Sequence, residues 1–194
     1  MELKDPGAFR ALAYPLRLSL FERLGILGTA TASQLAEYVD ESPANCSFHL
    51  RVLAKHGYIE RVESSDGRER PWRLLDMTQN WAPDQPPETA GARDALEDAL
   101  LEWDTARRRQ ARRSPRPEAW KGKMTAISAT LFLTPDEARE LGDALADLVN
   151  PYIERWDTGE RPAGGAPVRV LAETFLVPES LGAGAVPAEE GDPK

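Results

Sequence analysis

The sequence has one cysteine, two histidines and no long apolar run. The single cysteine, Cys46, cannot form an intrachain disulfide, which excludes a disulfide-stapled secreted domain. The N-terminus, MELKDPGAF, lacks the basic segment and following apolar segment of a signal peptide. No stretch approaches the roughly 18 apolar residues of a membrane span. These absences predict a cytoplasmic protein without a membrane partner.

Signatures of catalysis are also missing. No pairing of a nucleophile with a base emerges, and the short segments GTAT and PAGGAP lack the lysine or the strand–helix context of a nucleotide site. We therefore predict that the protein is not an enzyme and needs no cofactor.

The net charge of −8 argues at first against a nucleic-acid partner, but the charge is unevenly distributed. Residues 43–75 carry six basic and four acidic side chains, which gives +2. From Met124 to the end, five basic and thirteen acidic side chains give −8. Because the excess of acidic side chains lies in the C-terminal part, the net charge does not prevent the N-terminal part from binding a polyanion.

The N-terminal part has the pattern of several short helices. Leucines repeat at helical spacing over residues 12–27, and Pro15 is expected to begin a second helix after a short first one. Thr31 with Gln34 three residues later predicts a capping box at the start of another short helix.

A further helix and a hairpin follow. Ser42 and Pro43 have the residue types of a helix cap and first position, and this helix should run to about Lys55 and stop at Gly57. The segments YIERVE and PWRLL alternate apolar with polar residues, so they predict a β-hairpin with Gly67 near its tip. Two helices across a tight turn, followed by a two-stranded wing, make a winged helix-turn-helix.

The second half predicts a separate region. A long helix is expected over residues 92–113, and strands are expected over residues 124–133 and 168–177. Between the two strands, a second helix should open with a capping box of Thr134 and Glu137 and be kinked or broken at Pro151. The fold class is therefore α+β and helix-rich, an N-terminal winged helix-turn-helix followed by a C-terminal α/β dimerisation or effector region. The predicted organisation is a DNA-binding domain at 1–76, a linker at 77–91, the dimerisation or effector region at 92–178 and a disordered tail at 179–194.

The segments LAYPLRLSLFERL, TASQLAEYVDESPANCSFHLRVLAKHGYIERVES and GRERPWRL resemble the ArsR-type (arsenic-repressor-like) winged-helix transcriptional regulators over about residues 8–75. The segment from Ser47 to Leu50 corresponds to the recognition helix of that family. The C-terminal segments LTPDEARELGDAL and RPAGGAPVRV resemble the extension of a metal-independent branch. The resemblance implies a homodimer that binds a pseudo-palindromic operator in double-stranded DNA.

Residues at the front of the recognition helix are candidates for reading bases. An outward asparagine can pair with adenine and a phenylalanine can contact a thymine methyl, although a merely solvated helix face is the alternative. Long cations later in the helix and on the wing are placed for phosphates. For His49, a phosphate contact and packing beneath the helix both remain open. The predicted DNA-binding residues are Ser42, Asn45, Ser47, Phe48, His49, Arg51, Lys55, Arg68 and Arg70.

The closeness of Cys46, His49 and His56 suggests a metal site, but helical spacing favours another interpretation. Cys46 lies four residues before Leu50 on the inward stripe, where a free cysteine behaves as a small apolar residue. Metal-sensing members of the resembled family carry a cysteine pair in the preceding helix, and the segment here is TASQLAEYV. We therefore predict no metal site and no metal response through that helix.

The long helix carries two further features. Leu96, Leu100 and Trp103 form an apolar stripe that predicts a dimerisation or core contact. The cluster Arg107–Arg113 either touches flanking DNA or ends a dimerisation helix, and acidic neighbours favour the second alternative. Binding of an unknown small-molecule effector by the C-terminal region remains an open alternative. The competing function is a winged-helix module for protein–protein contact without specific DNA binding.

Overall fold

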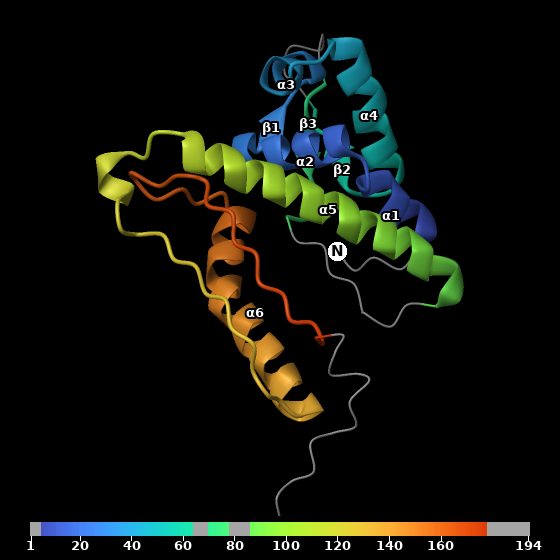
Figure 1. Ribbon diagram of the computed structural model, residues 1–194. Helices are drawn as coiled ribbons and strands as arrows, with labels where there is room; N and C mark the ends of the chain where they lie inside the picture. The colour runs from blue at the N-terminus through green and yellow to red at the C-terminus, as the bar shows by residue number, and fades with distance from the viewer. Residues whose placement is uncertain (1–4, 64–69, 78–85, 178–194) are drawn as a thin grey trace, which may run out of the picture. The chain divides into compact units, whose positions relative to one another are not determined.

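The structure, a computed structural model, describes residues 5–63, 70–77 and 86–177. Figure 1 shows the order of the elements along the chain. The helices and strands are α1 (Pro6–Leu12), α2 (Pro15–Leu27), β1 (Thr29–Ala30), α3 (Ala32–Val39), α4 (Pro43–Lys55), β2 (Ile59–Arg61), β3 (Trp72–Leu74), α5 (Pro87–Arg113), the 3-10 helix η1 (Glu118–Trp120) and α6 (Pro135–Asp157).

The helix starts predicted for the N-terminal part are confirmed. Helix α2 begins at Pro15. At the start of α3, the Thr31 hydroxyl accepts from the Gln34 amide at 3.2 Å and the Thr31 amide donates to Gln34 Oε1 at 2.9 Å, which is a complete capping box. Ser42 Oγ accepts from the amide of Asn45 at 3.1 Å and caps α4. These local hydrogen bonds fix the two helices of the helix-turn-helix.

The wing is part of a three-stranded antiparallel sheet in the order β1-β3-β2. Ile59 pairs with Leu74 and Arg61 with Trp72, as the predicted hairpin requires. The sequence did not predict β1, which adds a third strand by pairing Thr29 with Arg73. A two-residue strand is too short to show an alternating pattern, so only the tertiary structure reveals it.

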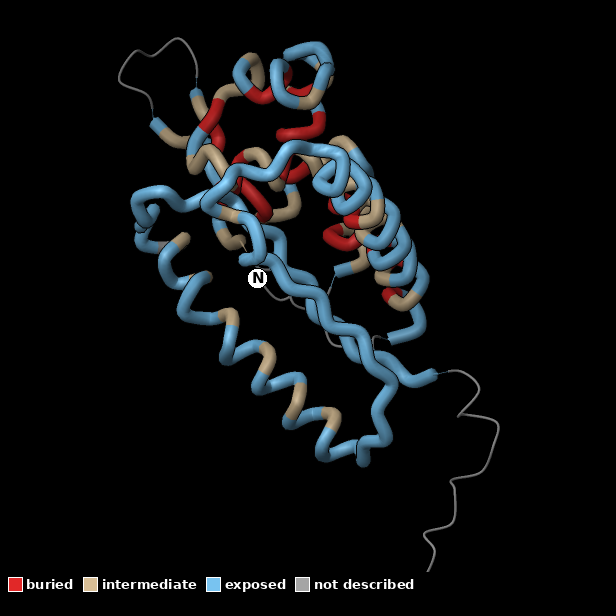
Figure 2. Tube along the Cα trace, turned by 60° about the vertical axis from the view of Figure 1, so that its left-hand side comes forward, coloured by how far each residue is buried: buried red, intermediate tan, exposed pale blue. Residues whose placement is uncertain are grey.

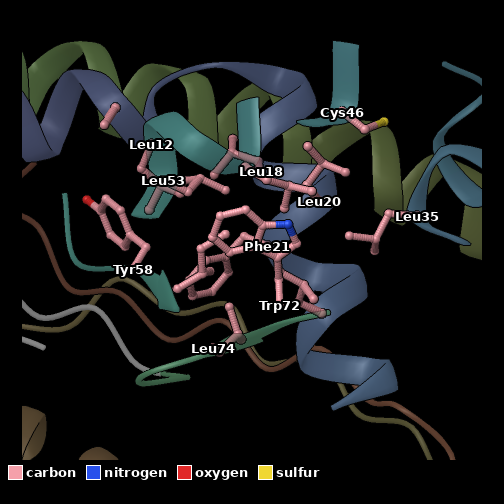
Figure 3. Packing of buried hydrophobic residues seen from close by; sticks show 14 of the residues in the cluster. Leu12, Leu18, Leu20, Phe21, Leu35, Cys46, Leu53, Tyr58, Trp72 and Leu74 are labelled. Atoms are coloured by element: carbon pink, nitrogen blue, oxygen red, sulfur yellow. The ribbon is translucent and has the colours of Figure 1, made fainter. Parts of the chain in front are cut away.

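A hydrophobic core joins these elements (Figure 3). Tyr58, directly after the positive-φ Gly57, is buried and its hydroxyl donates to the Ala8 carbonyl at 2.8 Å. The ring of Phe21 meets Tyr58 edge-on, with centroids 6.1 Å apart. Figure 2 shows that the buried residues concentrate in the N-terminal part of the chain. The fully buried side chains are Phe9, Leu12, Leu20, Leu24, Leu35, Cys46, Leu50, Leu53, Tyr58, Ile59 and Leu96.

Helix α5 packs on α1 and α2 and belongs to the same compact unit as the winged helix. It begins at Pro87, earlier than the predicted start at residue 92. Trp103 Nε1 donates to Ser19 Oγ at 3.2 Å, and the Arg107 guanidinium forms an ion pair with Glu22. These contacts hold the helix against α2.

A second compact unit comprises residues 128–152 and, among the later residues that the structure describes, residues 166–177. Helix α6 begins in this unit and opens as predicted, because the Thr134 amide donates to Glu137 Oε2 at 2.7 Å and Thr134 Oγ1 accepts from the Glu137 amide at 3.3 Å. The helix continues through Pro151 to Asp157, so of the kink or break expected at Pro151 the break is wrong and the kink stays a prediction. None of the helices in the described ranges combines the length and apolar character needed to cross a membrane.

The two strands predicted for the C-terminal region are wrong. The structure assigns no strand to residues 124–133 or 168–177. Their large apolar side chains are exposed, with Phe132 at 95% and Phe175 at 77% of their full accessibility. A strand needs a neighbouring strand to complete its hydrogen bonds, and an apolar pattern alone does not supply one. The described C-terminal region is therefore mostly helical in its regular structure, and the expected disordered tail lies outside the described residues.

Candidate nucleic-acid interface

Helix α4 has one buried face and one exposed face. Its inward side chains are buried in the core, and Figure 1 shows the helix at the edge of the N-terminal unit. Ala44, Phe48, Arg51 and Lys55 follow the spacing of one helical stripe and are exposed. This stripe can enter a groove of DNA without disturbing the core, because the opposite face alone holds the helix in place.

The predicted base-reading residues lie on and beside this stripe. Phe48 is 55% exposed and Ser42 is exposed, whereas Asn45 and Ser47 are half-buried at the edges of the stripe. Ala44 was not among the predicted residues, although helical spacing places it on the stripe. An exposed apolar methyl at this position is suited to contact a thymine methyl.

Glu41 is a second residue that the sequence interpretation missed. Its carboxylate Oε2 accepts a hydrogen bond from Asn45 Nδ2 at 2.9 Å. The amide predicted to read a base therefore donates one of its two N–H groups within the protein, and its second N–H group and its carbonyl oxygen can still pair with adenine in the bidentate manner. The position of Glu41 directly before the helix cap Ser42 is the sequence signal that could have indicated this contact.

The side chain of His49 lies on the buried side of the recognition helix α4. It is 7% exposed and stacks on the Tyr14 ring, with centroids 4.9 Å apart and planes 17° apart. Its Nδ1 lies 3.4 Å from Arg17 Nη1, and its ring meets Phe48 edge-on. Burial lowers the pKa of His49, and the Arg17 cation lowers it further, against a smaller opposing effect of Glu41. Of the two alternatives left open by the sequence, this position favours packing.

The lowered pKa of His49 has a predictable effect on stability. The unfolded chain, with an ordinary histidine pKa of about 6.5, binds the proton before the folded chain does as the pH falls. The contribution of His49 to stability is therefore complete above that pH and is lost as the pH falls through the lower folded pKa. In urea denaturation from about pH 8 to about pH 5, His49→Gln should show a shallower loss of stability than wild type. An identical pH slope in the two proteins would contradict this prediction.

On the wing, the cations are held to different extents. Arg61 donates from Nη1 to the Arg70 carbonyl at 2.6 Å, and its guanidinium lies 4.0 Å from the centroid of the Trp72 ring. Arg73 pairs with Glu60 at 2.5 Å. Arg70 is exposed two residues before β3 begins, where it can reach a phosphate. Arg68 and the predicted hairpin tip at Gly67 lie outside the described residues.

Cys46 occupies the core position that its spacing predicted. It is free and fully buried, and burial raises the pKa of its thiol, with Glu41 raising it further. Figure 3 shows Cys46 among the core side chains. In the ranges that the structure describes, no group of three or more histidine, cysteine, aspartate or glutamate side chains could hold a metal ion.

Cys46→Ala should lower stability by about 1 kcal/mol, because it removes a small buried side chain, and should leave DNA affinity nearly unchanged. Thermal unfolding and DNA titration of the two proteins, each with and without zinc or an oxidant, check this. A tenfold change of wild-type affinity with zinc or oxidant, absent from the variant, would show that the thiol has a chemical role.

The arginine cluster at the end of α5 divides into two parts. Arg107 is tied to Glu22 of α2, and its guanidinium lies 5.1 Å from the centroid of the Trp103 ring. This arginine fixes the helix to the domain. The exposed members of the cluster are Arg108, Arg109, Arg112 and Arg113.

Comparison with known proteins agrees with this geometry. A helix-turn-helix domain family matches residues 12–62, which contain α2, α3, α4 and β2. The N-terminal part thus has a winged helix-turn-helix fold, as the sequence predicted. The match to the ArsR type in particular stays a resemblance.

Solved structures give more distant similarities. A mutant of Lactococcus lactis ZitR is 13% identical, with 70% of this chain and 74% of that chain covered and a TM-score of 0.27. The same mutant in its apo form is 17% identical, with 71% and 83% covered and a TM-score of 0.29. The transcriptional regulator SlyA is 13% identical, with 75% and 79% covered and a TM-score of 0.30. No curated protein matches the chain.

Proposed function

We propose that the protein is a sequence-specific DNA-binding transcriptional regulator that acts as a homodimer on a pseudo-palindromic operator without a metal cofactor. The observation that carries the proposal is the exposed stripe of α4, on which Phe48, Arg51 and Lys55 project from a helix whose other face is buried. The family match to a helix-turn-helix domain covers this helix.

The stripe has the division of roles expected of a recognition helix. Its front, near Asn45 and Phe48, presents an amide and an aromatic ring, which can read adenine and the thymine methyl. Its rear presents Arg51 and Lys55, cations that more often contact phosphates than bases. Arg70 on the wing adds a cation for the neighbouring backbone.

The test is selection of duplexes from a random-sequence pool, followed by titration of the selected sequence at several salt concentrations. We expect one preferred palindromic sequence and an affinity that falls steeply with salt, because phosphate contacts release counterions. Arg51→Ala and Lys55→Ala should each lower the salt slope by about one unit per lost phosphate contact. No sequence preference and little dependence on salt would favour the competing function, a winged helix for protein contact.

The homodimer is proposed to form along α5. Leu96 is fully buried within the protomer, and Leu100 and Trp103 are partly buried against its core. The stripe predicted for dimerisation therefore contributes to the core of a single protomer. Leu101 lies beside it and is 63% exposed, which offers apolar surface to a second copy. Two copies would place their recognition helices about one DNA turn, roughly 34 Å, apart.

Sedimentation velocity at micromolar concentration should show a dimer. Leu101→Glu should shift it toward monomer, because a carboxylate is costly to bury in an apolar interface. Leu148→Glu is the matched control, since Leu148 is also an exposed leucine on a helix and lies in the second compact unit. A monomeric wild type that binds one half-site with full affinity would exclude the dimer.

A further inference from the structure

Helix α5 lies along the outside of the N-terminal unit (Figure 1), and one stripe of its side chains faces away from α1 and α2. The helical period places this stripe opposite Leu96, which is buried against the core. Its members follow one another at alternating steps of four and three residues, the spacing of a coiled-coil seam. The outward stripe consists of Asp94, Asp98, Leu101, Thr105, Arg108 and Arg112.

Contacts within the protomer do not account for the charged members of the outward stripe. In the parts of the chain that the structure describes, Asp98, Arg108 and Arg112 are exposed and take part in no ion pair. Asp94 pairs with its neighbour Arg93 at 2.7 Å, yet its side chain remains 58% exposed. These charges are therefore available to a partner.

The helix dipole does not explain the order of these charges. Acidic side chains near the start of a helix and basic ones near its end are favourable, but the effect falls off beyond the first and last turns. Asp94, Asp98 and Arg108 all lie more than one turn from either end of α5. The outward stripe is acidic in its first part, apolar at the exposed Leu101 and basic in its last part, and this order fits a partner surface with the reverse order.

A second copy of α5 that runs in the opposite direction has this reverse order. When Leu101 of each copy faces Thr105 of the other, every acidic member of the outward stripe faces a basic one. The two-fold axis of a dimer repeats each of these pairs. Parallel helices would instead bring each charged member against its own copy, so that like charges would meet. The facing charged pairs of the antiparallel arrangement are Asp98 with Arg108 and Asp94 with Arg112.

We propose that α5 pairs antiparallel with α5 of a second copy along the outward stripe, and that the order of charges sets the direction and register of this pairing and selects chains with the same order. The inference rests on the homodimer proposed above and adds the geometry of its interface and its selectivity. Burial of Leu101 supplies the apolar contact at the centre. The charged pairs act mainly on selectivity, because exposed opposite charges attract weakly whereas like charges brought face to face repel.

Charge reversal tests the pairing in the full-length protein without DNA. Arg108→Asp places a carboxylate opposite Asp98 of the second copy, and Asp98→Arg places a guanidinium opposite Arg108. Each change should raise the dimer dissociation constant roughly tenfold or more, measured by sedimentation velocity over a range of concentrations. Arg113→Asp is the matched control and should change this constant less than about threefold, because Arg113 is also exposed at the end of α5 but lies off the outward stripe.

Combining the two changes distinguishes charge pairing from damage to the helix. A chain with both Asp98→Arg and Arg108→Asp keeps opposite charges at the facing positions, so its dissociation constant should return to within about threefold of wild type. A mixture of the two single variants should form a heterodimer tighter than either homodimer, because each reversed residue then faces an opposite charge. Variants that merely misfold would show neither effect, and that result would overturn the pairing.

Two further outcomes would also overturn the pairing. The first is a wild type that is monomeric or a dimer that all the reversals leave unchanged. The second is an Arg108→Asp variant that keeps the dimer and loses affinity only for duplexes extended beyond the selected operator, which would assign this arginine to flanking DNA.

Operator binding is measured separately, by fluorescence anisotropy with the selected duplex, so that the two proposals can fail independently. A dimer that follows the charge pattern but binds no preferred sequence would refute the proposed regulator and retain the pairing. Operator binding by a dimer that ignores the reversals would retain the regulator and overturn the pairing.

Discussion

Replacing Leu50 by alanine is expected to lower the unfolding free energy by about 2–5 kcal/mol, the range for a large-to-small change in a core. Leu50 is fully buried on the inward face of α4, within the cluster formed by the helices and the sheet. The change removes apolar burial and leaves a cavity that the surrounding side chains fill only in part. Because α4 is held by this face alone, the loss should also loosen the recognition helix.

Urea denaturation of wild type and Leu50→Ala measures this loss. The matched control is Leu75→Ala, since Leu75 is half-exposed after β3 and the same substitution there should cost less than about 1 kcal/mol. Equal losses at the two positions would show that Leu50 is not in the core. A loss below about 1 kcal/mol for Leu50→Ala would also show that Leu50 is not in the core.

Replacing Asn45 by alanine should cost roughly 1–3 kcal/mol on the true operator and little on scrambled DNA, as for a residue that reads a base. Asn45 donates one Nδ2–H to Glu41 in the free protein and keeps a second for a base, so the whole of this range applies. Titration of both proteins against both duplexes provides the measurement. Equal losses on operator and scrambled DNA would show that the reading face lies elsewhere.

Arg68→Ala supplies the contrast for Asn45→Ala. Arg68 follows Gly67 at the predicted hairpin tip, where a long cation reaches phosphate or the minor groove. Its loss should weaken binding to operator and scrambled DNA alike and lower the salt slope by about one unit. A loss confined to the operator would instead make Arg68 a base-reading residue.

The N-terminal fold could be predicted because its signals are local. The capping box of Thr31 and Gln34, the Ser42 cap and the glycine at position 57 each fix a helix end through neighbours in the sequence. Once those ends are known, helical spacing alone assigns Cys46 to the core and Phe48 to solvent. These assignments needed no knowledge of other parts of the chain.

The candidate site could be predicted only in part, since some of its contacts join distant residues. The stacking of His49 on Tyr14 and its approach to Arg17 bring α4 against α2, and no spacing within either helix reveals them. Glu41 was missed because the engagement of its carboxylate depends on the direction of the Asn45 side chain.

The sequence by itself determined the helix-turn-helix, the hairpin and the inward position of Cys46, because caps, turns and helical period act over a few residues. Only the tertiary structure decided that β1 pairs with β3, that α5 completes the N-terminal core through Leu96, and that residues 124–133 form no strand. Strand pairing and helix packing depend on partners far along the chain. A local pattern shows that a segment has an apolar face, but the partner that covers it is fixed by the rest of the fold.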